Sequence, residues 1–237
     1  MFGVLSFLIH LPFTFHYGLY FGSDMAIVYL VPLRMLKGEF SIYLWGQDYM
    51  GLGPVDFITA GLFKVFGPSI PLAGMVNLFA WSVGIGLLVA YVGHCFGKRV
   101  MIASGCALAI GVPYFIKFST QVYGTQYNMI PLAMGGFLWL AVLLVQHGAR
   151  SWLCVMTGLI MGWHWYADKL VANVWISIGL AFLLMPEGQA FLREFVRSKI
   201  AVVTLLAFLI GYSPELLYRA GLITDRYGHV EKAAHFF

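Results

Sequence analysis

Residues 70–95 read IPLAGMVNLFAWSVGIGLLVAYVGHC, an uninterrupted run without Asp, Glu, Lys or Arg. As a helix this run would be about 39 Å long at 1.5 Å per residue. The hydrocarbon core of a bilayer is only about 30 Å thick. The run therefore predicts a membrane-spanning helix in the first half of the chain.

The composition of the whole chain points to the same class of protein. Of 237 residues, 61% are hydrophobic and 10% are charged, and the mean hydropathy is +0.84. Soluble domains have about 25% charged residues, so a soluble cytoplasmic enzyme is excluded, as is a disordered chain. The net charge of +4 comes from basic and acidic residues spread along the chain, and no nucleic-acid partner is expected. Three scattered cysteines are too few for a disulfide framework or a metal cluster.

Six further apolar runs predict additional spans, and continuous apolar runs of this length favour helices. The sequence thus predicts an all-α, polytopic membrane protein with about seven transmembrane helices. The expected spans cover residues 2–21, 70–95, 100–116, 127–146, 151–167, 170–186 and 200–218. The first run has no basic segment before it, so we interpret it as a membrane helix rather than a signal peptide, in a chain trimmed at its start.

The distribution of basic residues predicts a cytoplasmic N-terminus, because short cytoplasmic loops are enriched in Lys and Arg. With this orientation the inner loops contain Lys98, Arg99, Arg150, Arg193, Arg197 and Lys199. The short outer loops contain only Lys117 and Lys169. Of the ten acidic residues, only Glu187 and Glu194 fall inside. Because the acids were not used to set the orientation, their position favours chemistry on the outer face.

The first outer loop, residues 22–69, is too long for a simple connection. It contains two apolar stretches, residues 25–36 and 54–66, that are too short to span a bilayer. We expect two interfacial helices there, the second starting at Pro54 and ending at Gly67. Between them lies the aromatic, glycine-containing segment YLWGQDYMG at residues 43–51.

Four short motifs follow one another in this region: SDMA at 23–26, LKGEF at 36–40, GQDYMG at 46–51 and LFKVFGPS at 62–69. Across residues 20–95 their order and spacing resemble the membrane glycosyltransferases of the GT-C class, which use polyprenyl-phosphate-linked sugars. The protein O-mannosyltransferases, the aminoarabinose transferases of lipid A and the bacterial family 39-like transferases belong to this class. Its members are about twice as long or more. The resemblance therefore implies that residues 1–237 are a single N-terminal module, incomplete at the C-terminus.

The resemblance also implies a reaction: inverting transfer of a sugar from a polyprenyl phosphate to a hydroxyl of a lipid, glycan or protein acceptor. It places the enzyme in a bacterial or archaeal plasma membrane, with its active site outside. Asp24, where the first span ends, would be the general base that takes the acceptor proton. The residues alone allow a second interpretation, in which Asp24 caps the helix that follows it.

Substrate-binding roles follow from the same resemblance. Arg34, Lys117 and above all Lys169 are the candidates to stabilise the leaving phosphate. Gln47, Asp48 and Tyr49 would bind sugar hydroxyls. Asp24 and Asp48 are also the candidate ligands of a divalent cation, Mg²⁺ or Mn²⁺.

Each of these roles has a structural alternative. Lys169 can be an interfacial residue paired with Asp168, and the aromatic residues at 163–166 can be a belt at the membrane surface. The polar loop can simply satisfy its own backbone.

A non-catalytic membrane scaffold or a transporter-like subunit is the alternative function. The transporter version is less favoured, because we see no internal repeat. In addition, no Asp, Glu, Lys or Arg lies at the centre of an expected span.

Overall fold

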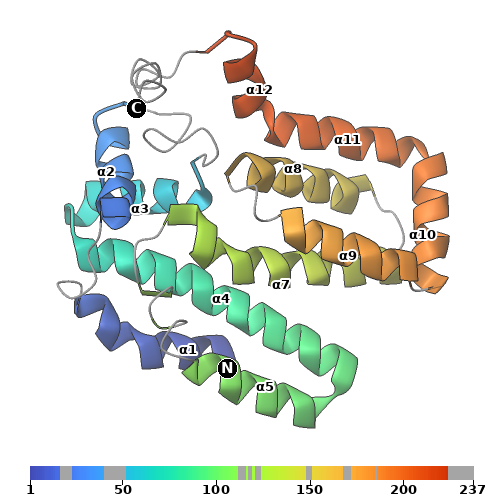
Figure 1. Cartoon of the computed structure of the whole chain (residues 1–237), viewed down its shortest axis with the longest axis horizontal. Helices are drawn as coiled ribbons and strands as arrows, with labels where there is room; N and C mark the ends of the chain where they lie inside the picture. Colours follow the sequence, from blue (N-terminus) through green and yellow to red (C-terminus); the bar gives the residue numbers. More distant parts are fainter. Residues whose placement is uncertain are drawn as a thin grey trace, which may run out of the picture.

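The structure is a computed structural model that describes residues 1–16, 23–39, 52–111, 116, 119–120, 124–147, 151–167, 172–184 and 186–223. Within these residues the chain is all-helical and contains no strand. The prediction of an all-α protein is thereby confirmed. Most of the helices run roughly along the long axis of the molecule (Figure 1).

The first half of the chain is organised around α4 (Ile70–Phe96), against which α1 (Phe2–His10) and α5 (Lys98–Ile110) pack. Both neighbours are shorter than expected. The helix predicted over 2–21 changes at Leu11 to a 3-10 helix, Leu11–Phe15, because Pro12 offers no backbone N–H. The helix predicted over 100–116 ends at Ile110, because Gly111 has a φ of 68° and turns the chain.

The second half contains α7 (Gly124–His147), α8 (Ser151–Ala167), α9 (Ala172–Leu184), α10 (Pro186–Arg197), α11 (Lys199–Gly211) and α12 (Ser213–Arg219). The bounds of α7, α8 and α9 agree with the expected segments. The segment 200–218 is different, because α11 and α12 meet at an angle of 64°. Pro214 in the first turn of α12 is consistent with a new helix starting there.

Helix length tests only part of the seven-span prediction. Among the described helices, α4 alone is long and apolar enough to cross a bilayer by itself, and the bent pair of α11 and α12 becomes a second candidate if a broken span is counted. The other expected spans therefore remain predictions.

The two short helices predicted between residues 22 and 69 are present, as α2 (Ser23–Met35) and α3 (Pro54–Phe66). Gly67, with a φ of 84°, ends α3 where the sequence predicted. The rings of Tyr29 in α2 and Phe63 in α3 meet edge to face, 5.4 Å apart. Around this contact is a buried apolar cluster shared by α2, α3 and the start of α4, formed by Val31, Met35, Leu52, Ala60, Phe63 and Ala73.

Close backbone contact joins α8 to α11, and small residues make it possible. Gly158 and Gly162 lie four residues apart on α8, and Ala207 and Gly211 are spaced in the same way on α11. A Cβ atom at Gly162 would overlap the carbonyl oxygen of Phe208, and one at Gly211 would overlap that of Leu159. Such small-residue spacing is typical of helix pairs in membranes.

Gly162→Ala should therefore destabilise the protein by about 1–3 kcal/mol, because the new methyl group forces α8 and α11 apart. The measurement is the free energy of unfolding in detergent micelles. Gly136→Ala is the matched control in α7, since its Cβ meets no atom within 4 Å. The control should be neutral, or more stable by up to about 1 kcal/mol. Equal effects of the two variants would contradict the proposed role of close backbone contact.

Candidate functional site

Most of the predicted site residues lie beyond what the structure describes. Gln47, Asp48, Tyr49 and Lys169 are outside the described residues. Asp24 is the second residue of α2, and its side chain is also outside the described part. Arg34 lies half-buried in the last turn of α2, where its carbonyl oxygen accepts the N–H of Lys37 at 2.8 Å. The convergence of these residues on one site stays a prediction.

Leu52 directly follows the segment that contains Gln47, Asp48 and Tyr49, and it contacts the helix that precedes Lys169. Its backbone N–H donates to the hydroxyl of Tyr166 at 3.3 Å. Its carbonyl oxygen accepts the indole N–H of Trp163 at 3.0 Å. Both partners lie in the last turns of α8, three residues apart, so one helical face binds both polar groups of one residue. We call this arrangement the Leu52 clamp.

The clamp residues lie close in sequence to two of the predicted site residues. Tyr49 lies three residues before Leu52, and Lys169 lies three residues after Tyr166. The Leu52 side chain is 6% exposed and belongs to the apolar cluster of α2, α3 and α4. The clamp therefore attaches Leu52, the residue that follows GQDYMG in the sequence, to α8, the helix that precedes Lys169.

The clamp changes the interpretation of the aromatic run at 163–166. A belt at the membrane surface would expose these side chains, yet Tyr166 is only 4% exposed. For Tyr166 the belt interpretation is wrong, and Trp163 also has a specific partner. Sequence reasoning did not identify these two residues as tertiary contacts. The sequence feature that could have identified them is the presence of two aromatic side chains with polar groups, three residues apart on one face of a helix just before Lys169. Such side chains usually find a hydrogen-bond partner when they are buried.

Tyr166→Phe should weaken the clamp, because it leaves a buried N–H without a partner, at a cost of about 1–3 kcal/mol. Hydrogen exchange of a peptide containing Leu52 is the measurement, and we expect loss of protection there. Tyr29→Phe is the control, since it keeps a ring in the same apolar cluster. Unchanged protection in Tyr166→Phe would show that the hydroxyl does not anchor Leu52.

Asp56 stabilises the start of α3, directly after the clamp. Its Oδ2 accepts the N–H of Gly53 at 2.8 Å, and its own N–H donates to the carbonyl of Gly53 at 3.1 Å. Such an arrangement is typical of an acid in the first turn of a helix, where it satisfies a backbone N–H and interacts favourably with the helix dipole. Burial raises the pKa of Asp56 to about 7, and this effect outweighs the hydrogen bond from Gly53, which lowers it.

The shift predicts how stability changes with pH. The folded state keeps a proton on Asp56 that the unfolded state, with a pKa of 3.8, releases. The contribution of Asp56 is therefore largest below pH 4, falls as the pH rises, and levels off above about pH 7. Asp56→Asn keeps an acceptor for the Gly53 N–H but has no group that ionises. Between pH 5 and pH 8 the unchanged protein should lose up to about 2 kcal/mol of its free energy of unfolding through Asp56, and the variant should not show this loss. Unfolding measured at both pH values tests this, and parallel pH profiles would contradict it.

An aromatic cluster between α7, α8 and α9 adjoins the residues of the clamp. The rings of Trp165 and Trp175 stack at 5.4 Å, and Phe137 meets Trp175 edge to face at 5.8 Å. His164 also contacts Phe137, at 5.7 Å. The Nδ1–H of His164 donates to the carbonyl of Ile160 in its own helix at 2.8 Å. This bond sets the tautomer of His164 and leaves its buried Nε2 atom without a hydrogen-bond partner.

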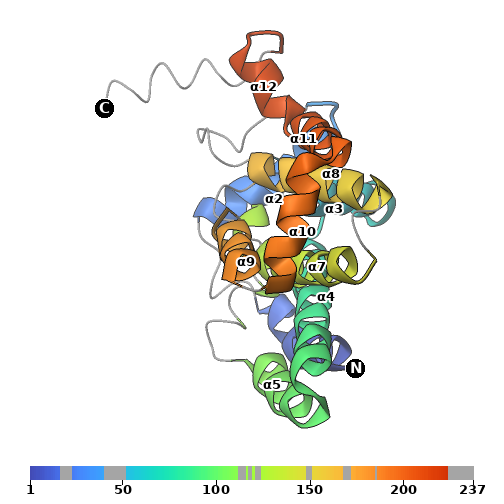
Figure 2. The ribbon, with the colours of Figure 1, turned by 90° about the vertical axis from the view of Figure 1, so that its right-hand side faces the viewer.

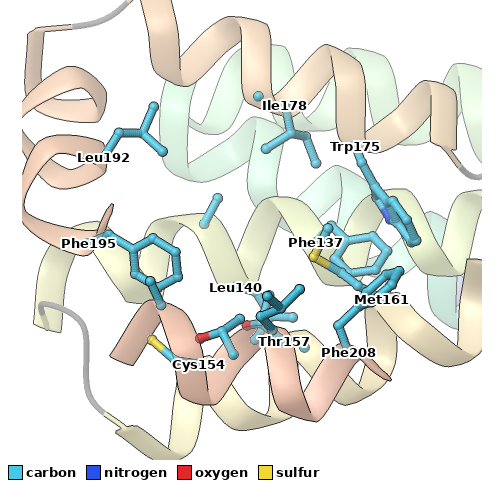
Figure 3. Close-up of a pocket in the computed structure, with 16 residues that line it drawn as sticks. Phe137, Leu140, Cys154, Thr157, Met161, Trp175, Ile178, Leu192, Phe195 and Phe208 are labelled. Carbon is cyan, nitrogen blue, oxygen red and sulfur yellow. The ribbon is translucent and has the colours of Figure 1, made fainter. Parts of the chain in front are cut away.

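Beside this cluster, side chains of α7 to α11 line a partly open apolar cavity of about 420 Å³ (Figure 3). Phe137, Met161, Trp175 and Phe208 lie at one end of the cavity, and Leu192 and Phe195 of α10 lie at the other. Two threonine hydroxyls in the lining donate to carbonyls of their own helices. The cavity therefore offers an apolar surface, and its volume is in the range of ligand sites.

The predicted divalent cation is not tested by this arrangement. Among the described residues, no group of three or more His, Cys, Asp or Glu side chains could hold a metal ion. The side chains of Asp24 and Asp48, the expected ligands, lie outside those residues.

Comparison with known protein families, with curated proteins and with solved structures finds no match to this chain. Functional inference therefore rests on the motifs of the first outer loop and on the geometry of the clamp and the cavity.

Proposed function

We propose that the chain is part of an integral membrane glycosyltransferase that moves a sugar from a polyprenyl phosphate to an acceptor hydroxyl on the outer face. The Leu52 clamp is the observation on which the proposal rests. It joins Leu52 to Trp163 and Tyr166. Leu52 directly follows the GQDYMG motif, and Tyr166 precedes Lys169 by three residues, so the clamp adjoins in sequence both segments assigned to donor binding. A scaffold without a shared site has no need to join them.

The proposed chemistry is a single displacement at the anomeric carbon of the sugar. Asp24 takes the proton of the acceptor hydroxyl, and the acceptor oxygen forms the new bond to that carbon. The bond between the anomeric carbon and the phosphate oxygen breaks, and the electron pair leaves with the polyprenyl phosphate. Arg34 and Lys169 stabilise the negative charge that develops there. No step requires the predicted metal ion.

The apolar cavity supports a donor with a hydrocarbon tail. It adjoins the aromatic cluster that includes Trp165, in the last turn of α8 next to the clamp. A tail in the cavity would lose contact with water, which favours binding by about 25 cal/mol for each Å² buried. The proposal also includes the seven-span topology, for which α4 and the glycine contacts of α8 and α11 are the structural support.

Transfer of labelled sugar from polyprenyl-phosphate donors, measured in membranes that contain the chain, tests the proposal. Asp24→Asn should reduce the rate by about 10²–10⁴-fold, because the acceptor proton then has no base. Asp56→Asn is the matched control in the same outer segment, and its rate should stay within about twofold of the unchanged chain, because Asp56 caps a helix.

The same assay tests the cavity through Gly179, which lines it and whose Cβ would meet no atom within 4 Å. Gly179→Leu should raise the KM for the donor and leave kcat unchanged, because it occupies space meant for the tail. Full activity in Asp24→Asn would refute the assigned base. If the unchanged chain transfers no sugar and binds donors no better than a plain lipid, the scaffold alternative is correct.

A further inference from the structure

Helix α10 lies across the ends of α9 and α11 and connects them (Figure 1). Its two faces differ in character. Leu192 and Phe195 belong to the face that lines the cavity (Figure 3). Arg193 and Arg197, four residues apart, are exposed on the other face, and exposed Lys199 follows at the start of α11. We call Arg193, Arg197 and Lys199 the basic ridge.

No acidic side chain forms an ion pair with the basic ridge in the described part of the chain, although Glu194 lies three residues before Arg197 on the same helix. The only side-chain hydrogen bond recorded for Arg193 is to the amide oxygen of Gln189, at 3.5 Å. Glu194 is the acidic residue of α10 with a described side chain, and it points to solvent without an ion pair. The ridge is therefore available to an external anion.

The same end of the molecule has a second pair of exposed basic residues. Lys98 and Arg99 begin α5, and Figure 2, which looks at this end, shows α10 in front with the turn between α4 and α5 below it. The end is thus broadly basic. A flat array of anions would match it better than a single small ion.

Exposed apolar side chains lie beside the ridge. Leu184, at the end of α9, is 81% exposed, and Val196 of α10 is 72% exposed. Basic and apolar side chains at the same depth are typical of helices in the headgroup region of a bilayer, where the apolar ones enter the acyl layer. This pattern favours a lipid surface over a soluble partner.

We propose that the basic ridge of α10 binds the phosphate-bearing headgroups of an anionic bilayer leaflet, and that this contact holds Leu192 and Phe195 in the cavity wall. The inference rests on the membrane setting of the proposed function but requires no sugar transfer. The physical reason is that α10 has few apolar side chains facing the helices it crosses. A contact between the opposite face of α10 and the lipid therefore helps to hold the helix in place. Each basic residue strengthens binding to an anionic membrane surface by about fivefold.

Cys154 provides the measurement. It lines the cavity, it is 1% exposed, and the other two cysteines are exposed. In a Cys95→Ala/Cys106→Ala background, modification of Cys154 by a small maleimide reports how often the cavity opens. We expect modification to be about fivefold slower or more in nanodiscs containing phosphatidylglycerol than in pure phosphatidylcholine. Arg193→Gln/Arg197→Gln should abolish this difference.

Lys98→Gln/Arg99→Gln is the matched control, because it removes the same charge from the same end without changing α10. It should keep the lipid dependence. Equal rates in both lipids, or an equal loss of the difference in both double variants, would overturn the inference. If alkaline carbonate extracts the chain from native membranes, the chain is not an integral membrane protein, and both the proposed function and this inference fail. If the chain stays in the membrane and only the lipid dependence is absent, this inference alone fails.

Discussion

The rest of the candidate site depends on how one buried residue outside any helix satisfies its backbone. Leu52 precedes α3, and neither its N–H nor its carbonyl oxygen has a partner within that helix. A buried backbone group without a partner is costly, so both must find one elsewhere. Tyr166 and Trp163 supply them from α8. Through this requirement Leu52, which follows the GQDYMG motif, becomes attached to the second half of the chain.

The same helix, α8, takes part in two kinds of packing. Toward α11 its glycines allow backbone contact, which leaves no space between the two helices. Toward α9 and α10 the separation is larger, because the side chains of Phe137, Trp175 and Phe195 keep the helices apart and leave the cavity. Close contact on one side and large rings on the other thus explain why an apolar space exists beside the clamp.

How well the sequence predicted each helix depended on whether its ends have local causes. The ends of α3 were predictable because Pro54 and Gly67 act through their own backbone geometry. The breaks at Pro12 and Gly111 were missed, although they have the same kind of cause, because the apolar run continues past both residues. Hydropathy averaged over a span-length segment does not register a single residue that stops a helix.

The sequence by itself determined the helical class and most helix positions, because these properties depend on side-chain type and spacing along a few turns. Tertiary structure alone decided which group each polar aromatic side chain would bind. Tyr166 and Leu52 are 114 residues apart, and nothing in either local pattern indicates the other. A hydroxyl at the end of an apolar helix can reach headgroups or a buried backbone N–H. Only the tertiary placement of Leu52 beside the end of α8 brought that N–H within reach of Tyr166.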